Sequence, residues 1–231
     1  MKTIGMLGGM SWESTTSYYK AINEGVKAKL GGFHSAKIAL YSVDFSEIET
    51  LQHQGDWQQT ADILSAAARS VEAAGADFLL ICTNTMHKVA PQIEAGISIP
   101  LLHIADATAE QLLADGVKTV GLLGTAFTME QDFYKGRLSD KFGIEMIVPD
   151  SEQRAVVHKV IYSELCQGRI NHRSRKQYLD IIAQLQQQGA EAIILGCTEI
   201  ALLVQQEHTA VPLYDTTEIH AAAAVTFALQ K

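Results

Sequence analysis

The segment that decides the fold occurs twice, as Gly75-Ala76-Asp77-Phe78-Leu79-Leu80-Ile81-Cys82-Thr83 and again as Gly189-Ala190-Glu191-Ala192-Ile193-Ile194-Leu195-Gly196-Cys197. Residues 75 and 189 lie 114 positions apart. Each copy opens with the Gly-Ala pair typical of a helix end and continues as a short apolar run, the pattern of a buried strand. A single segment of this kind is common in α/β proteins, so the prediction of the fold depends on its repetition.

Two further pairs of segments repeat in the same order. Ile4-Gly5-Met6-Leu7-Gly8 matches Val120-Gly121-Leu122-Leu123-Gly124, and Ile99-Pro100-Leu101-Leu102-His103 matches Val211-Pro212-Leu213-Tyr214-Asp215. The spacings are 116 and 112 residues. A period near 114 is too long for a solenoid. The repeat therefore predicts two similar lobes of about four strands each.

Between the repeated segments, apolar runs alternate with helical patterns. We expect strands near residues 2–8, 37–44, 77–82, 99–104, 119–124, 143–148, 191–196 and 211–214. Helices are expected near 14–30, 57–74, 105–115, 129–141, 152–167, 173–188 and 217–230. Strands that are apolar throughout are typical of parallel sheets covered on both faces. The predicted fold is α/β, with two pseudo-symmetric lobes, each a parallel sheet of about four strands flanked by helices.

Composition narrows the class of partner. Hydrophobic residues make up 47 % of the chain, enough for a substantial core, and the net charge is −8. No segment is rich in Lys or Arg, so nucleic acid and anionic membrane are excluded as partners. No apolar run reaches membrane length. Three cysteines do not form a disulfide framework, which favours a reducing, cytoplasmic location.

Polar segments follow four of the expected strands: Gly8 to Ser11, Thr83 to Thr85, Gly124-Thr125, and Cys197 to Glu199. Ligands of open parallel sheets bind outside the carboxyl ends of strands, so these segments are the candidate site. If the two lobes face each other, these segments converge, and the repeat then predicts Thr83 and Cys197 at equivalent positions on opposite walls of the cleft. That arrangement suits the transfer of a proton from one face of a tetrahedral carbon to the other.

A thiol fits this chemistry because its reference pKa is about 8.5, so that ionisation at pH 7 costs only about 2 kcal/mol. A helix starting directly after Cys197 would reduce the cost further. The carbanion requires donors that neutralise the adjacent carboxylate. Asn84, Thr85 and Thr198, with nearby backbone N–H groups, are the candidates.

At these residues the sequence resembles the aspartate/glutamate racemase family over essentially its whole length. The resemblance rests on Ile4 to Met10, Asn84-Thr85, Gly196 to Glu199, and Val211 to Leu213. It implies a pyridoxal-free racemase with a cysteine from each lobe as acid and base, and often a dimer. It also implies that the C-terminal helix returns to the first lobe. The expected lobes are then 1–105 plus 212–231, and 106–211, with the active site in the cleft between them.

The chain departs from the family at the first cysteine, because Thr83-Asn84-Thr85 stands where the family has Cys-Asn-Thr. Cys82 lies one residue early, a register that points its side chain to the opposite face and into the core. By resemblance, Cys197 removes the proton from the L-amino acid. Thr83 ionises far from neutral pH and only donates or relays a proton. We therefore expect L-to-D conversion to be faster than the reverse.

The sequence indicates less clearly which residues bind the side chain of the substrate. The family usually has an arginine after the second strand, whereas residues 42–56 contain neither Lys nor Arg, and Gln52 is the polar candidate. Met10 lies where the family's first loop lines the cleft, and Thr125 and Glu199 are further binding candidates. The cluster of Arg169, Arg173, Arg175 and Lys176 could supply a cation or form a solvated helix face. Acidic substrates are the family default, and neutral ones such as homoserine, methionine or leucine follow closely.

No cofactor is expected. The glycines of residues 5–9 lack the dinucleotide-binding spacing, and the eight histidines lack metal-ligand spacing. Two other functions stay open. A decarboxylase or cis–trans isomerase of small dicarboxylates would need only one cysteine, and a binding or regulatory protein would keep the pocket without turnover.

Overall fold

The computed structural model describes residues 1–230, which form two compact units. The first unit contains Met1–Ile104 and the chain from His220 onward, and the second contains Ala105–Ile219. Each unit is an α/β structure built on its own parallel sheet. The described part of the chain contains no helix both long and apolar enough to cross a membrane.

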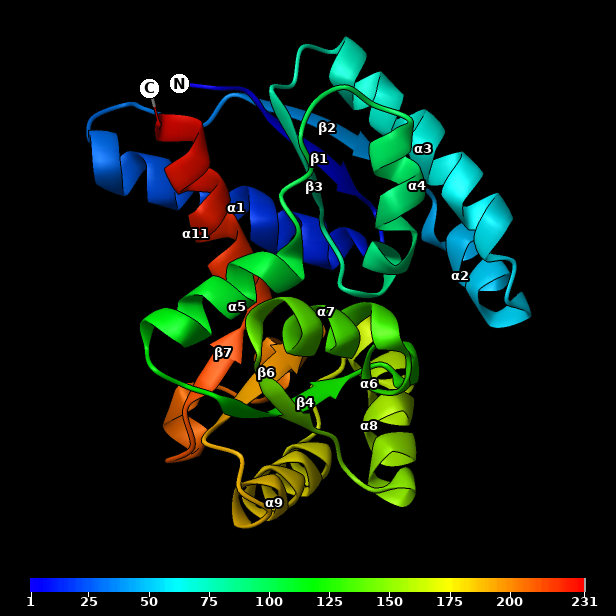
Figure 1. Ribbon diagram of the computed structural model, residues 1–231, viewed down its shortest axis with the longest axis vertical. Coiled ribbons are helices and arrows are strands. Elements are labelled where there is room, and N and C mark those ends of the chain that lie inside the picture. The colour runs from blue at the N-terminus through cyan, green and yellow to red at the C-terminus, as the bar shows by residue number, and fades with distance from the viewer. Residues whose placement is uncertain (231) are drawn as a thin grey trace. The chain divides into compact units, whose positions relative to one another are not determined.

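The sheet of the first unit has the strand order β2-β1-β3, with β1 at Ile4–Gly8, β2 at Ile38–Ser42 and β3 at Phe78–Ile81 (Figure 1). Strands β1 and β3 are buried along their whole length. The strand expected at 99–104 is reduced to one parallel bridge between Leu79 and Leu101. The first lobe therefore has three full strands.

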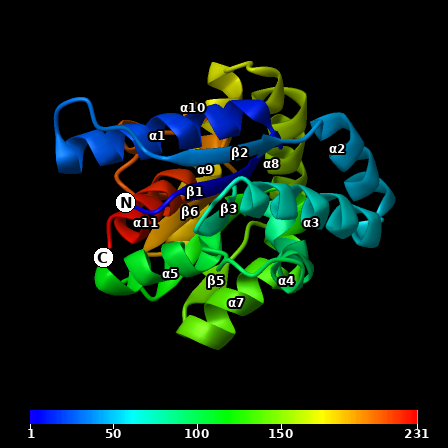
Figure 2. The same cartoon turned by 90° about the horizontal axis from the view of Figure 1, so that it is seen from above.

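Helices cover both faces of this sheet, as the apolar strands require (Figures 1 and 2). Side chains of α1 (Trp12–Leu30) and α11 (Thr216–Leu229) pack on one face, and those of α3 (Trp57–Ala73) and α4 (Ala90–Ala95) pack on the other. The return of the C-terminal helix, implied by the family resemblance, is present from His220 on.

One helix of the first unit was not expected. Residues Phe45–Gln54 form α2, which begins at the Asp44 side chain and ends at Gly55 in the left-handed region. Asp44 accepts a hydrogen bond from the Ser46 amide at 3.1 Å. Asp44 and Gly55, the start and stop signals of this helix, are both visible in the sequence, although the apolar pattern predicted no helix between them.

The sheet of the second unit has the order β5-β4-β6-β7. Figure 1 labels β4, β6 and β7, and Figure 2 labels β5. Its strands are β4 (Thr119–Gly124), β5 (Glu145–Ile147), β6 (Ala192–Gly196) and β7 (Leu213–Asp215). Because β7 pairs with β6, residues 212–219 belong to this unit. The expected boundary had placed them in the first lobe. The pairing partner of β7, rather than its sequence likeness to 99–103, decides its place.

The remaining helices belong to the connections. They are η1 (Thr85–Val89) in the first unit, α5 (Ile104–Ala114) beginning at its end, and α6 (Ala126–Glu130), α7 (Asp132–Phe142), α8 (Ser151–Ser163), η2 (Leu165–Gln167), α9 (His172–Gln187), α10 (Ile200–Leu203) and η3 (Gln206–His208) in the second. The helix expected at 129–141 is two helices, since the chain is extended at Gln131.

The two sheets share one register. Ile4 pairs with Phe78 in the first sheet, and Val120 pairs with Ala192 in the second. Leu79 bridges Leu101, as Ile193 pairs with Leu213. Residues that pair in the first sheet therefore correspond, in the alignment of the three repeated segments, to residues that pair in the second sheet. The internal repeat is therefore a repeat of strand pairing as well as of sequence.

Candidate active site

In the second unit the candidate site begins where two neighbouring strands end. Gly124 of β4 pairs with Gly196 of β6, so the residues that follow them, Thr125 and Cys197, leave the sheet side by side. A Cβ on Gly196 would lie 3.0 Å from the Leu123 carbonyl oxygen, closer than ordinary contact. Glycine is needed here for the close approach of the two backbones.

Cys197 is in direct contact with a carboxylate. Its Sγ donates to Oε2 of Glu199 at 3.0 Å, and the Thr198 hydroxyl donates to the same oxygen at 2.6 Å. Cys197 is 9 % exposed and Glu199 is 4 % exposed. Burial raises the pKa of the Cys197 thiol well above its ordinary value, and the negative charge on Glu199 raises it further. The resting group is therefore a thiol hydrogen-bonded to a carboxylate.

This state corrects one expectation from the sequence. A following helix was expected to favour the thiolate, but α10 has only four residues and starts after Glu199. Its dipole is too short to offset burial and a carboxylate at hydrogen-bond distance. The sequence placed Glu199 near the site without revealing that its side chain turns back to the sulfur.

Thr125 has a structural role in addition to its place beside Cys197. Its Oγ1 accepts a hydrogen bond from the Thr128 amide at 3.3 Å and thereby caps α6. The next amide, that of Ala126, donates to Nδ1 of His158 at 3.1 Å. Two side-chain contacts, neither of them evident in the sequence, thus hold the loop after β4.

In the first unit, Thr83 lies two residues past the end of β3 and is half-buried. The Ser14 hydroxyl donates to the Cys82 carbonyl at 2.8 Å, and Nδ1 of His87 lies 2.8 Å from the Thr83 carbonyl oxygen. Cys82 itself is fully buried in the core, and burial raises the pKa of its thiol. The expectation that Cys82 is a packing residue is confirmed.

Asn84 and Thr85 open the short helix η1 and are 3 % and 6 % exposed. Both follow Thr83 directly, so the three residues form one polar turn at the carboxyl end of β3. The equivalent turn in the second unit is Cys197, Thr198 and Glu199, after β6. Each unit therefore presents one polar turn after the strand that the repeat predicts.

Comparison with known proteins identifies the family of the chain. The sequence model of the Asp/Glu/Hydantoin racemase family matches residues 7–224. The chain belongs to this racemase family. The broad specificity amino-acid racemase of Bacillus subtilis is 25 % identical over 229 residues, which cover 96 % of each chain. These likenesses indicate an amino-acid racemase, an isomerase.

Solved structures give the same result. A protein of Yersinia pestis assigned as an Asp/Glu racemase matches with a TM-score of 0.93 at 58 % identity, and the match covers 100 % of both chains. An aspartate racemase homologue from Pyrococcus horikoshii matches with a TM-score of 0.87 at 34 % identity, again over 100 % of both chains. The fold described above is thus the fold of the family.

Two residues that the sequence assigned to the racemase pocket are buried in the first unit. Met10 is 3 % exposed and belongs to the core cluster on the α3 face of the sheet. Gln52, on α2, is 2 % exposed. Gly9, beside Met10, has a φ of +94°, and a Cβ there would lie 2.3 Å from the Val43 carbonyl oxygen. The backbone of this loop is therefore closely confined.

The basic cluster near α9 is mostly a solvent-exposed surface. Arg169, Arg173 and Lys176 are exposed, whereas Arg175 is half-buried. Nε of Arg175 donates to the carbonyl of Leu203 at 2.7 Å, at the end of α10. Arg175 thus supports the short helix that follows Cys197. Within residues 1–230, no group of three or more His, Cys, Asp or Glu side chains could hold a metal ion.

Proposed function

We propose that this racemase interconverts L- and D-amino acids without pyridoxal or another cofactor, with Cys197 and Thr83 acting on opposite faces of one Cα. The observation that carries the proposal is the Cys197–Glu199 pair, at the residue equivalent to Thr83 in the repeat. The proposal requires both turns to reach the same substrate molecule, which the activity tests below address.

The thiol–carboxylate pair supplies a proton path. Before it can act as a base, Cys197 passes its proton to Oε2 of Glu199, 3.0 Å away. The thiolate then takes the α-proton of the L-amino acid, which leaves a carbanion at Cα. The Thr83 hydroxyl delivers a proton to the opposite face and is re-protonated from water, and Glu199 releases its proton to the solvent. The D-amino acid therefore forms with no net change in the enzyme.

Stabilising the carbanion falls to donors in the two polar turns. Asn84 and Thr85, with the Thr198 hydroxyl, are proposed to bind the substrate carboxylate and so disperse the charge that develops at Cα. Until it takes the Cys197 proton, Glu199 carries the opposite charge to the substrate ammonium group, which it is proposed to bind. Thr125, which caps α6 and follows the strand beside that of Cys197, is proposed to line the same side of the pocket.

The direction of faster turnover follows from the two different groups. A thiolate removes a proton readily at neutral pH, whereas a threonine hydroxyl is a poor base. Removal of the proton from the L-face by Cys197 is therefore faster than removal from the D-face by Thr83. The equilibrium between enantiomers stays at unity, so only the rates differ.

Aspartate and glutamate are the proposed substrates, with homoserine, methionine or leucine as the alternative set. Gln52 replaces the cation that an acidic side chain would prefer, and its neutral amide can donate a hydrogen bond to a carboxylate or to another polar group. Met10 and Gln52 are proposed to shape the side-chain pocket from the first unit.

The test is α-proton exchange in D₂O with each of these amino acids as pure L and pure D substrate, with no cofactor added. We expect a faster initial exchange from the L-enantiomer. Cys197→Ser should abolish exchange, and Thr83→Cys should retain it and speed the D-direction. Equal initial rates from both enantiomers, or an active Cys197→Ser protein, would contradict the proposal.

The presence of one cysteine where the family has two favours a second candidate. A decarboxylase or cis–trans isomerase of small dicarboxylates could work with Cys197 alone. Release of carbon dioxide from a substituted malonate, or isomerisation of maleate, together with no α-exchange of amino acids, would establish it. Binding of an amino acid with neither reaction would instead indicate a binding protein.

The proposal also includes a cytoplasmic location and a homodimer. A reducing compartment keeps Cys82, Cys166 and Cys197 as the free thiols they are. Light scattering coupled to size-exclusion chromatography measures the oligomeric state directly. A mass of one chain at micromolar concentration would contradict the dimer and leave the chemistry untouched.

A further inference from the structure

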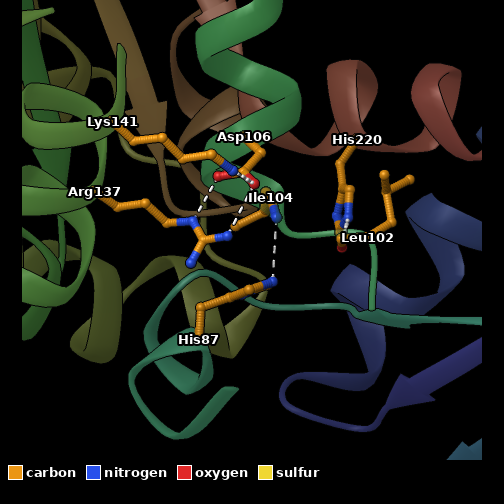
Figure 3. A network of polar contacts seen from close by, with 7 residues as sticks. All are labelled: His87, Leu102, Ile104, Asp106, Arg137, Lys141 and His220. Atoms are coloured by element: carbon orange, nitrogen blue, oxygen red, sulfur yellow. Dashed lines mark hydrogen bonds and ion pairs between the residues drawn. The ribbon is translucent and has the colours of Figure 1, made fainter. Parts of the chain in front are cut away.

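His87 is tied at both ring nitrogens to backbone atoms of the first unit. Nδ1 lies 2.8 Å from the Thr83 carbonyl oxygen, and the amide nitrogen of Ile104 lies 3.2 Å from Nε2 (Figure 3). A carbonyl can only accept and an amide N–H can only donate. The ring must therefore be neutral, with its proton on Nδ1.

The surroundings of His87 favour the neutral ring. The side chain is 2 % exposed, and the ring of His103 lies 4.4 Å away between centroids. The ring of His220 is 6.0 Å from it, and burial lowers the pKa of His220 to about 4. Tyr18 is the titratable group of α1 at this cluster, with its hydroxyl 2.8 Å from Nδ1 of His220.

The segment that His87 contacts is also held from its other side. His220 lies with Nε2 2.8 Å from the Leu102 carbonyl oxygen (Figure 3). Ile104 is the last residue of the first unit before the chain enters the second, and His220 is the first residue after it returns. The points where the chain leaves and re-enters the first unit are thus both bonded into one histidine cluster.

Thr83 has no strand hydrogen bonds to define its position, since β3 ends at Ile81. Its carbonyl is held by His87, and the preceding carbonyl by Ser14. A displacement of about 1 Å at a reacting group can lower a rate by about 100-fold. The contact that holds the Thr83 backbone is therefore expected to matter for any proton transfer by its hydroxyl.

We propose that His87 is a positioning residue, whose neutral ring links the Thr83 backbone to Ile104 and so sets the Thr83 hydroxyl for re-protonation of the substrate. The inference rests on the proposed racemase function, in which Thr83 acts in the second proton transfer. His87 itself touches neither substrate nor reacting atoms in this role.

Two substitutions separate the two bonds. In His87→Asn the side-chain amide nitrogen takes nearly the place of Nδ1, so the bond to Thr83 can persist while that to Ile104 is lost. In His87→Gln the amide oxygen reaches nearly the place of Nε2, so the bond to Ile104 can persist while that to Thr83 is lost. His34→Gln, at an exposed histidine, is the matched control.

The readout is the fate of L-substrate in D₂O. When Thr83 is misplaced, the carbanion takes its deuteron back from the Cys197 side, and deuterated L-amino acid accumulates without inversion. We expect the ratio of deuterated L to deuterated D product to rise by about 10-fold or more in His87→Gln and to stay within about twofold in His87→Asn. The KM should change little in either variant.

A purely structural role would lower the melting temperature of both variants without separating their product ratios. Equal ratios for His87→Asn and His87→Gln would overturn the proposal. Nitrogen-15 NMR of the histidine rings gives an answer that does not depend on activity: we expect the Nδ1–H tautomer at His87. An Nε2–H ring there would refute the inference, whereas a wild-type chain without α-exchange would refute the racemase proposal instead.

Discussion

Cys197 and Glu199 share one proton, and the charge on Glu199 helps to keep it on sulfur. Glu199→Gln removes that charge, so the pKa of the thiol should fall and alkylation by iodoacetamide should become faster at neutral pH. If Glu199 is also the proton acceptor, kcat should nevertheless fall about 100-fold. Rising alkylation with falling kcat is the expected combination. An unchanged kcat with a raised KM would assign Glu199 to ammonium binding alone.

Single residues also show how far the sequence can be read. Cys82 and Thr83 differ by one strand position, and the alternation of side chains predicted that Cys82 is buried in the core. The contact between Cys197 and Glu199 and the tautomer of His87 were beyond reach. Both depend on side-chain rotamers, and the tautomer of His87 also depends on Ile104, 17 residues from it in the sequence.

Helices and strands were predicted where local patterns are strong. The strand at Thr119–Gly124 was predicted with both ends correct. The segment at 99–104 failed because its neighbours offer one bridge only, and its likeness to 211–215 cannot reveal how many partners it has. Strand length in a sheet is decided by the partner, which a single segment does not encode.

At the junction of β7 and α11, Asp215 gives a prediction for an element boundary. Burial raises the pKa of this carboxyl from 3.8 to about 6, although the Thr217 amide donates to Oδ1 at 2.8 Å. The folded state therefore prefers the protonated carboxyl. The stability that this preference contributes is complete below pH 3.8 and is lost as pH rises through about 6.

Asp215→Asn keeps the acceptor oxygen and removes the charge. We expect the variant to unfold at the same urea concentration as the wild type near pH 4, and to be more stable by about 2 kcal/mol above pH 7. Circular dichroism at both pH values measures this difference. A stabilisation of equal size at pH 4 and pH 8 would show that the charge is not its source.

In the second unit, ion pairs join α5 to α7. Arg137 Nε lies 2.5 Å from Asp106 Oδ1, and Lys141 Nζ lies 2.6 Å from Oδ2 (Figure 3). Burial raises the pKa of Asp106, but hydrogen bonds from the two cations outweigh it, and the pKa lies below its ordinary value. Arg137→Gln should weaken the contact between α5 and α7, because Lys141 alone cannot form the paired contact of a guanidinium. We expect faster amide hydrogen exchange in these two helices of the variant and nowhere else. Exchange rates in α5 and α7 equal to those of the wild type would contradict this.

On the scale of the whole molecule, the chain is two copies of one strand pairing with different chemistry at equivalent turns. The equality of register, Ile4 with Phe78 and Val120 with Ala192, shows that the repeat constrains the backbone while leaving the site residues free to differ. A threonine can therefore stand where its counterpart is a cysteine without disturbing either sheet. The proposed difference between the L-to-D and D-to-L rates therefore comes from two different side chains that follow equivalent strands.

His220 joins three parts of the chain that are far apart in sequence, and its ionisation should report on their packing together. It contacts the Tyr18 hydroxyl on α1 and the Leu102 carbonyl, each at 2.8 Å. Burial lowers the pKa of His220 from 6.5 to about 4. The folded state thus excludes a proton that the unfolded chain binds. The stability due to the neutral ring is complete above pH 6.5 and is lost as pH falls toward 4.

His220→Gln keeps a donor for Leu102 but cannot ionise. Between pH 7 and pH 4 the wild type should lose up to about 3 kcal/mol more of its unfolding free energy than the variant, the equivalent of a shift of about two pKa units. At pH 7 the variant should be slightly the weaker, because the acceptor for Tyr18 changes. Urea unfolding followed by circular dichroism across this range measures both effects. Parallel pH profiles for the two proteins would mean that the His220 ring accepts a proton in the folded state as readily as in the unfolded chain.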